Sequence, residues 1–222
     1  MTFRVFMLAT LLSNLAGCAT IAPPYPPRVE ERIALHSAST PCCEDPERFD
    51  YQPLPAAGAL EWLIGPDSPT FDFQSGVSPF AAFRLPDADG PFRIRVQGLF
   101  DGKGEDTSVF YPILAMLDDA FVVTRVSYLD NLRLEQGLLE VDGQPGLAVI
   151  APFDPRRTRE RYMVIFTPGV LVDRPPPYDR PGDQVTLPSL DWLERNSAAV
   201  VPASPYGRLR LTIAPIELPG AG

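Results

Sequence analysis

The sequence predicts an all-β protein, an antiparallel β-sandwich of the jelly-roll type. The first observation behind this prediction is the abundance of residues that break helices, because 27 prolines and 16 glycines occur among 222 residues. Proline is excluded from helix interiors and from central positions of sheets, which leaves room mainly for short strands. The second observation is a series of short segments with alternating apolar and polar residues, which is typical of sandwiches and barrels. With 45% hydrophobic residues, the chain can also build a sizeable core.

The clearest strands are residues 92–97 and 208–213, in which apolar side chains alternate with arginine, glutamine or threonine. This alternation predicts strands with one buried and one solvated face. Residues 162–167 carry apolar side chains on both faces, as in a central buried strand. Pro112 places the apolar run 109–117 at a strand start or a sheet edge. The other expected strands are 70–73, 80–85, 121–128, 138–141 and 147–152, with turns at Asp118-Asp119 and Asp142-Gly143.

The N-terminus carries the features of a secretory signal. One cation, Arg4, precedes a short apolar run, residues 5–12, which is too short to span a bilayer. Small residues then lead into a cysteine in Leu15-Ala16-Gly17-Cys18. This stretch resembles the bacterial lipoprotein signal, in which cleavage leaves the cysteine as the first residue and its sulfur carries a diacylglycerol. We therefore expect Cys18 to be lipidated; the alternative is a plain secretory signal with an incidental cysteine.

The residue after the lipidated cysteine predicts the location of the protein. Ala19, rather than an aspartate, follows Cys18, and this resembles lipoprotein signals that are released to the outer membrane. Two or more acyl chains anchor a protein stably in a bilayer, whereas one chain holds it weakly. The expected location is therefore the periplasm, with the lipid anchor in the outer membrane.

Composition divides the chain into a signal peptide, a tether, a folded domain and a tail, at residues 1–17, 18–40, 41–217 and 218–222. Within the tether, residues 23–27 favour polyproline II, and residues 29–36 could form a brief helix. Nothing in the sequence predicts a surface for the tether to pack on, so we expect it to be disordered. The folded domain includes a proline-rich excursion at 173–205, with a short helix expected at 191–194.

The charge balance excludes a nucleic-acid partner. The formal net charge is −9 at pH 7, and removal of residues 1–17 removes only Arg4, so the mature chain carries −10. An acidic surface repels both nucleic acid and anionic lipid headgroups.

The sequence offers no catalytic constellation, so we expect neither an enzyme nor a cofactor. The only histidine, His36, lies in the tether, which excludes histidine-activated nucleophiles and histidine zinc sites. A pair of carboxylates such as Asp118-Asp119 could serve glycoside hydrolysis, but this pair lies at a predicted turn. Residues 101–106 resemble a calcium loop only loosely, because Lys103 occupies the third position and the sixth is not glycine. We therefore expect no bound metal.

Two adjacent cysteines, Cys42 and Cys43, remain if Cys18 is acylated. The periplasm is oxidising, so these neighbours could form a vicinal disulfide. Adjacent Cα atoms are about 3.8 Å apart, which is shorter than the usual range of about 4.4–6.8 Å for a disulfide. The bond could act as a switch or a rigid turn; the alternative is two small residues, with any bond between them purely structural.

Aromatic residues in expected loops are the candidates for contacts with a sugar or a protein partner. We single out Tyr51, Trp62, Tyr111 and Trp192; Tyr25, Tyr178 and Tyr206 also lie outside the expected core. Tryptophan and tyrosine at such places suit stacking on sugar rings or partner contacts. The alternative is that these rings cap the edges of the sandwich core.

Four stretches resemble the maltose operon periplasmic protein family: Pro41-Cys42-Cys43, Phe49-Asp50-Tyr51-Gln52-Pro53-Leu54, Ser78-Pro79-Phe80-Ala81-Ala82-Phe83-Arg84-Leu85-Pro86 and Ser204-Pro205-Tyr206-Gly207. The resemblance implies a non-enzymatic periplasmic accessory of maltose and maltodextrin uptake. Expected partners are therefore a maltodextrin, and a porin or another component of sugar transport. The alternatives are a structural envelope lipoprotein that contacts other proteins without binding sugar, and a glycan hydrolase that uses carboxylates.

Overall fold

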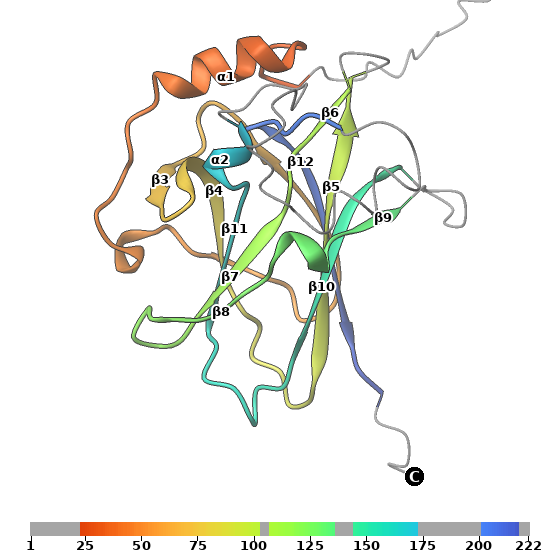
Figure 1. Cartoon of the computed structure of the whole chain (residues 1–222). Helices are drawn as coiled ribbons and strands as arrows, with labels where there is room; N and C mark the ends of the chain where they lie inside the picture. The colour runs from red at the N-terminus through yellow and green to blue at the C-terminus, as the bar shows by residue number, and fades with distance from the viewer. Residues whose placement is uncertain (1–22, 103–106, 136–143, 173–200, 218–222) are drawn as a thin grey trace, which may run out of the picture.

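The chain folds as two β-sheets packed face to face (Figure 1). The computed structural model describes residues 23–102, 107–135, 144–172 and 201–217. All the strand pairs within the two sheets are antiparallel except one, in which the short β1 (Gln52–Pro53) runs parallel to β4 (Gly76–Arg84). The predicted all-β sandwich is therefore confirmed.

The first sheet has the strand order β1-β4-β11-β7-β8, and β3 also pairs with β4. Besides β1 and β4, its strands are β3 (Thr70–Phe73), β7 (Ile113–Leu117), β8 (Val123–Val126) and β11 (Tyr162–Phe166). The second sheet has the order β2-β12-β5-β10-β9, and β6 also pairs with β5. Its strands are β2 (Gly58–Ile64), β5 (Phe92–Asp101), β6 (Ser108–Val109), β9 (Arg133–Glu135), β10 (Gly146–Phe153) and β12 (Gly207–Pro215).

The eight principal strands follow the connectivity of a jelly roll. The chain crosses between the sheets from β2 to β4, β5 and β7, forms the hairpin β7–β8, and then crosses back through β10, β11 and β12. Two sheets of four main strands with this alternation form the double Greek key of that fold. The first principal strand, β2, consequently lies beside the last, β12.

The main core fills the space between the two sheets. Strand β12 shows how it forms, since Leu209, Leu211 and Ile213 are buried while the intervening residues are half-exposed. The first sheet contributes Phe83, Leu114, Met116, Met163 and Ile165 to the same cluster. The outward-facing residues of 92–97 and 208–213 are polar, as the alternation in these segments predicted.

Most expected strands form, with differences at their ends. The run 109–117 is divided into β6 and β7 around Pro112, because a proline cannot donate to a ladder. The turn at Asp118-Asp119 joins β7 to β8, and the Asp118 carboxylate accepts hydrogen bonds from the backbone N–H groups of Ala120 and Val122. Strand β2 was not predicted. The expected strand 138–141, its turn at Asp142-Gly143 and the expected helix at 191–194 lie outside the described residues.

The expectation of a disordered tether is wrong for residues 23–40. Helix α1 (Val29–Ser37) lies along one end of the sandwich (Figure 1), and its residues Val29, Arg32 and His36 are buried. These three positions share one face of a helix, which here packs on the domain. Tyr25, in the proline-rich stretch before the helix, is also buried. Residues 18–22 lie outside the described part of the chain.

Arg32 fixes α1 to the sandwich through a buried polar cluster. Its side chain is 1% exposed and lies 3.6 Å from the carboxylate of Asp101 at the end of β5. The guanidinium donates to the hydroxyls of Ser108 and Ser204 and to two backbone carbonyls of the proline-rich stretch. The Tyr25 hydroxyl donates to Asp101 over 2.6 Å. Burial and this hydrogen bond raise the pKa of Tyr25 well above its ordinary value, so its hydroxyl remains a donor.

Two α-helices, α1 and the short α2 (Gly169–Val172), are described, and none of the described helices is long and apolar enough to cross a bilayer.

Candidate apolar groove

A second apolar cluster covers the outer face of the first sheet. Along β4, Ala81 and Phe83 point into the main core, while Phe80 and Ala82 point to the opposite side. The outer cluster contains Phe49, Phe80, Ala82, Ile113, Ala115, Leu117, Val164 and Phe166. The first sheet is therefore apolar on both faces, which agrees with the prediction that residues 162–167 are buried on both sides.

This outer cluster is only partly covered and forms the floor of a groove of about 640 Å³. The β3–β4 hairpin forms one wall, and residues 126–129 after β8 form another. The lining residues are Pro46, Phe49, Phe71, Asp72, Phe73, Gln74, Ser75, Ile113, Ala115, Leu117, Val123, Val126, Ser127, Tyr128, Leu129, Val164, Phe166 and Pro168. A volume of this size falls within the range of about 300–1,000 Å³ that is usual for small-molecule sites.

Stacked rings hold the hairpin wall against the floor. The rings of Phe73 and Phe166 are parallel, with centroids 4.0 Å apart, and Phe71 meets Phe49 edge-on at 5.0 Å. The tip of the hairpin is held from the other side by α2, since the Val170 N–H donates to the Ser75 carbonyl. A Cβ on Gly169 would lie 2.8 Å from the backbone of Gly76, so this close approach requires glycine.

The groove has few polar side chains, and one of them, Ser75, has a buried hydroxyl. Among the described residues of the lining, Asp72 is the only ionised side chain; it is exposed, as is Gln74. The Ser127 hydroxyl accepts a hydrogen bond from the Leu114 N–H. Tyr128 is 71% exposed, so its ring is available at the mouth of the groove. The arrangement can bind an apolar group in the interior and a polar group at the rim.

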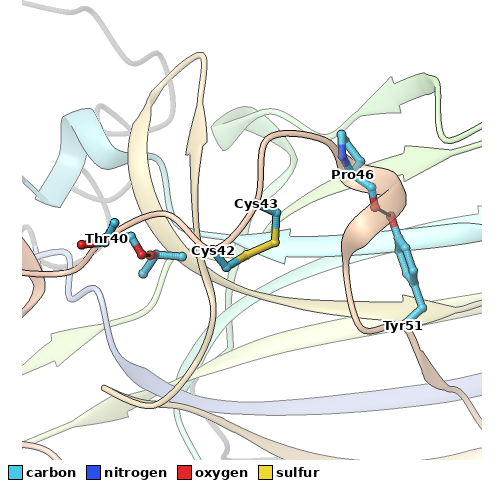
Figure 2. Close-up of a disulfide and its surroundings, with 6 residues drawn as sticks. Thr40, Cys42, Cys43, Pro46 and Tyr51 are labelled. Atoms are coloured by element: carbon cyan, nitrogen blue, oxygen red, sulfur yellow. Dashed lines mark hydrogen bonds between the residues drawn. A yellow bond between two sulfur atoms is a disulfide. The ribbon is translucent and has the colours of Figure 1, made fainter.

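The structure contains the vicinal disulfide, close to the groove (Figure 2). Cys42 is exposed and donates its N–H to the Thr70 carbonyl, whereas Cys43 is half-buried against the outer cluster. The chain then enters a 3₁₀ turn, Pro46–Arg48, which leads to Phe49. Pro46 accepts a hydrogen bond from the Tyr51 hydroxyl at 2.9 Å (Figure 2). The disulfide thus lies in the segment that contains the groove residues Pro46 and Phe49.

Among the predicted contact residues that the structure describes, Tyr51 alone lies beside the groove. It packs between Phe49, Phe121 and Tyr162, with ring centroids 4.4 Å apart in the pair with Tyr162. Burial and the neighbouring Tyr162 raise the pKa of Tyr51 well above its ordinary value. Tyr51 is therefore uncharged, and it packs against the groove residue Phe49 without lining the groove itself.

The two other predicted contact residues that the structure describes, Tyr111 and Trp62, are not at this site. Tyr111 was expected to be outside the core, and this is wrong, because it is 5% exposed and its hydroxyl donates to the Val201 carbonyl. Trp62 is half-buried on β2 and meets Phe83 edge-on, as a cap over the main core. Trp192 and the lipidation site Cys18 lie outside the described residues. The groove residues Phe71, Phe73 and Tyr128 were not singled out, although the alternation in 70–73 could have indicated the first two.

Replacing both Cys42 and Cys43 with serine is expected to change the melting temperature by only a few degrees. A bond between neighbours closes almost no loop, so it removes little chain entropy from the unfolded state. Thermal unfolding of the double variant, followed by circular dichroism, measures the effect. A loss of more than about 2 kcal/mol, the low end for an ordinary native disulfide, would contradict the expectation.

The described residues contain no group of three or more histidine, cysteine, aspartate or glutamate side chains that could hold a metal ion. Asp101, which opens the loop resembling a calcium site, is paired instead with Arg32 and Arg208.

Comparison with models of protein families, with curated proteins and with solved structures finds no match to this chain.

Proposed function

We propose that the chain is a non-enzymatic binding lipoprotein of the periplasm, anchored in the outer membrane, and that the groove on the first sheet is its binding site. The observation that carries this proposal is a groove of about 640 Å³ with an apolar floor, stacked aromatic walls and few polar side chains, of which Asp72 and Gln74 are exposed. An apolar site with a few polar groups at its edge is the usual form of a small-molecule site.

The state of the acidic residues supports binding rather than catalysis. The described residues of the groove lining include one carboxylate, Asp72, whereas glycoside hydrolysis requires two that face each other. Glu160 is buried, but both of its oxygens accept hydrogen bonds from Arg125 at 3.0 Å. Asp101 is likewise held by Arg32 and Tyr25. These carboxylates have structural partners and lie away from the groove lining.

A second candidate function is that of an accessory in maltodextrin uptake, and one observation favours it. Three of the four stretches that resemble the maltose operon family contribute to the outer cluster, through Cys43, Phe49, Tyr51 and Phe80. Phe49 and Phe80 are in contact, with centroids 4.3 Å apart. The segments that carry the resemblance thus meet beneath the groove, where the Tyr128 ring offers a stacking surface for a sugar. In this role a porin or another transport component would be the protein partner.

An uncharged dye tests the binding site. N-phenyl-1-naphthylamine, which becomes fluorescent in apolar surroundings, should bind saturably to the full secreted chain made soluble by Cys18→Ser. Val123 lines the groove, whereas its neighbour Val122 does not, and both are about half-exposed. Val123→Gln should weaken dye binding about three- to tenfold, because it removes part of the apolar contact of one valine.

The matched control for this test is Val122→Gln, which should leave dye binding unchanged. Both valines lie at the β7–β8 hairpin and have similar exposure, so the two variants bear similar costs in stability. Absence of saturable dye binding, or equal effects of the two substitutions, would contradict the proposed site.

Lipidation of Cys18 is tested separately. In cells labelled with palmitate, the wild-type protein should carry label and sediment with outer membranes, because several acyl chains make release negligible. The Cys18→Ser protein should carry no label and appear in the soluble periplasmic fraction. A Cys18→Ser protein that still sediments with membranes would contradict the proposed anchorage.

A further inference from the structure

The floor of the groove lies on the face of a sheet, and this restricts what can bind there. Val164 on β11 is paired with Ala82 on β4 and with Ala115 on β7. The backbone groups of these central positions are therefore directed within the sheet, and the floor presents methyl groups and rings. A peptide laid along this floor would bury its own N–H and C=O groups without partners, at a cost of about 1–3 kcal/mol each. A hydrocarbon chain has no such groups.

The size of the groove suits a chain rather than a single ring. An apolar cavity of about 150 Å³ is large enough for one benzene molecule. The groove, at about 640 Å³, is roughly four times larger, so it has room for a chain of ten or more carbon atoms. Its open side, with Tyr128 and Gln74 at the rim, leaves a polar headgroup in contact with water.

The charge of the groove selects an uncharged headgroup. The described residues of the lining include no lysine or arginine to pair with a carboxylate or a phosphate, and the one ionised residue among them, Asp72, is itself an anion. The mature chain carries a net charge of −10 on the boundaries expected from its sequence. Both features disfavour an anionic group at the mouth of the groove.

The packing of the N-terminal segment keeps the folded domain within a short reach of the expected lipid anchor, Cys18. The described part of the chain begins at Pro23, and the stretch that follows is fixed to the sandwich by Tyr25 and Arg32. Only five residue steps separate Pro23 from Cys18, which is a reach of at most about 18 Å. If Cys18 is anchored in the membrane, the domain is held against the lipid surface and not at the end of a long tether.

From these observations we propose that the groove takes up one hydrocarbon chain of a membrane lipid with an uncharged headgroup. This inference rests on the proposed function, since it names the ligand class of the same site. Phe73, Phe166 and Val164 enclose the chain, and the headgroup lies at the rim beside Tyr128. Binding of this kind draws its free energy from apolar area and has no need of hydrogen bonds in the interior.

Alkyl maltosides test the proposal, because they join a neutral sugar headgroup to chains of chosen length. Hexyl, octyl and decyl maltoside, each used below its micelle concentration, should displace N-phenyl-1-naphthylamine from the secreted Cys18→Ser chain. Each added methylene should raise the affinity about fourfold, as expected for burial of a CH₂ group. Laurate should bind more weakly than dodecyl maltoside, and Val123→Gln but not Val122→Gln should reduce the affinity for decyl maltoside.

Two outcomes would overturn the proposal. If the affinity does not change with chain length although the dye still binds in the groove, the site binds apolar rings and not chains, and the proposed function stands without this inference. If maltoheptaose displaces the dye better than octyl maltoside does, the site recognises sugar, which favours the role in maltodextrin uptake. Loss of dye binding itself would instead contradict the proposed function.

Discussion

Replacing Arg32 with alanine is expected to lower the melting temperature of the domain by about 10 °C or more. The substitution leaves the Asp101 carboxylate, whose side chain is 12% exposed, without its buried cation. It also removes the hydrogen bonds that the guanidinium donates to the hydroxyls of Ser108 and Ser204. Removing one partner of a buried ion pair costs about 3–5 kcal/mol, because the other charge remains buried. For a domain of this size each kcal/mol corresponds to about 2–4 °C.

The matched control is Arg28→Ala. Arg28 precedes α1 and is exposed, so its loss should shift the melting temperature by no more than a degree or two. Thermal unfolding followed by circular dichroism distinguishes the two variants. Equal stability of the Arg32 and Arg28 variants would mean that the N-terminal segment contributes nothing to the fold, in conflict with its burial.

Replacing Gly98 with alanine is expected to destabilise the domain by about 3 kcal/mol, the upper end for overpacking a core. A Cβ at this position would overlap the carbonyl oxygen of Phe110, which belongs to the backbone and cannot rotate away. Strand β5 cannot shift to relieve the overlap, because Gly98 is paired with Leu147 on one side and Leu209 on the other. Chemical denaturation of the variant measures the loss.

Gly90 provides the control for this substitution. A Cβ at Gly90 meets no atom within 4 Å and its backbone lies outside the left-handed region, so alanine fits there without strain. Gly90→Ala should leave stability unchanged or raise it by about 0.4–1 kcal/mol, because alanine reduces the freedom of the unfolded chain. Similar losses for both variants would show that the contact between Gly98 and Phe110 is not what requires glycine.

Periodicity predicted the strands whose two faces have different surroundings. Strands β5 and β12 were recognised because one face packs in the core and the other meets water. Strand β2 was missed, since its outward-facing Leu63 is apolar and 40% exposed, which interrupts the alternation with Leu60 and Trp62. Alternation predicts a strand only where the positions that face solvent are occupied by polar residues.

The buried N-terminal segment and the groove could not be predicted from local patterns. The face of α1 that packs on the sandwich contains a cation and an imidazole, Arg32 and His36, and the partners of Arg32 are Asp101, Ser108 and Ser204, which are distant in sequence. The apolar side chains of 162–166 indicated that both faces of β11 would be buried, but not that one of them would remain partly open. What covers an apolar face is decided by tertiary arrangement, which the sequence of a single strand does not contain.

The position of β12 determines when this protein can fold if it is exported, as proposed above. Strand β12 is the last described strand of the chain, and yet it lies inside the second sheet, between β2 and β5. A chain that crosses a membrane from its N-terminus therefore cannot close that sheet until residues 207–215 have emerged. Until then the edges of β2 and β5 are unpaired, and unpaired edges are templates for association with other chains. A factor that shields these strands in the interval would protect the nascent protein from aggregation and proteolysis.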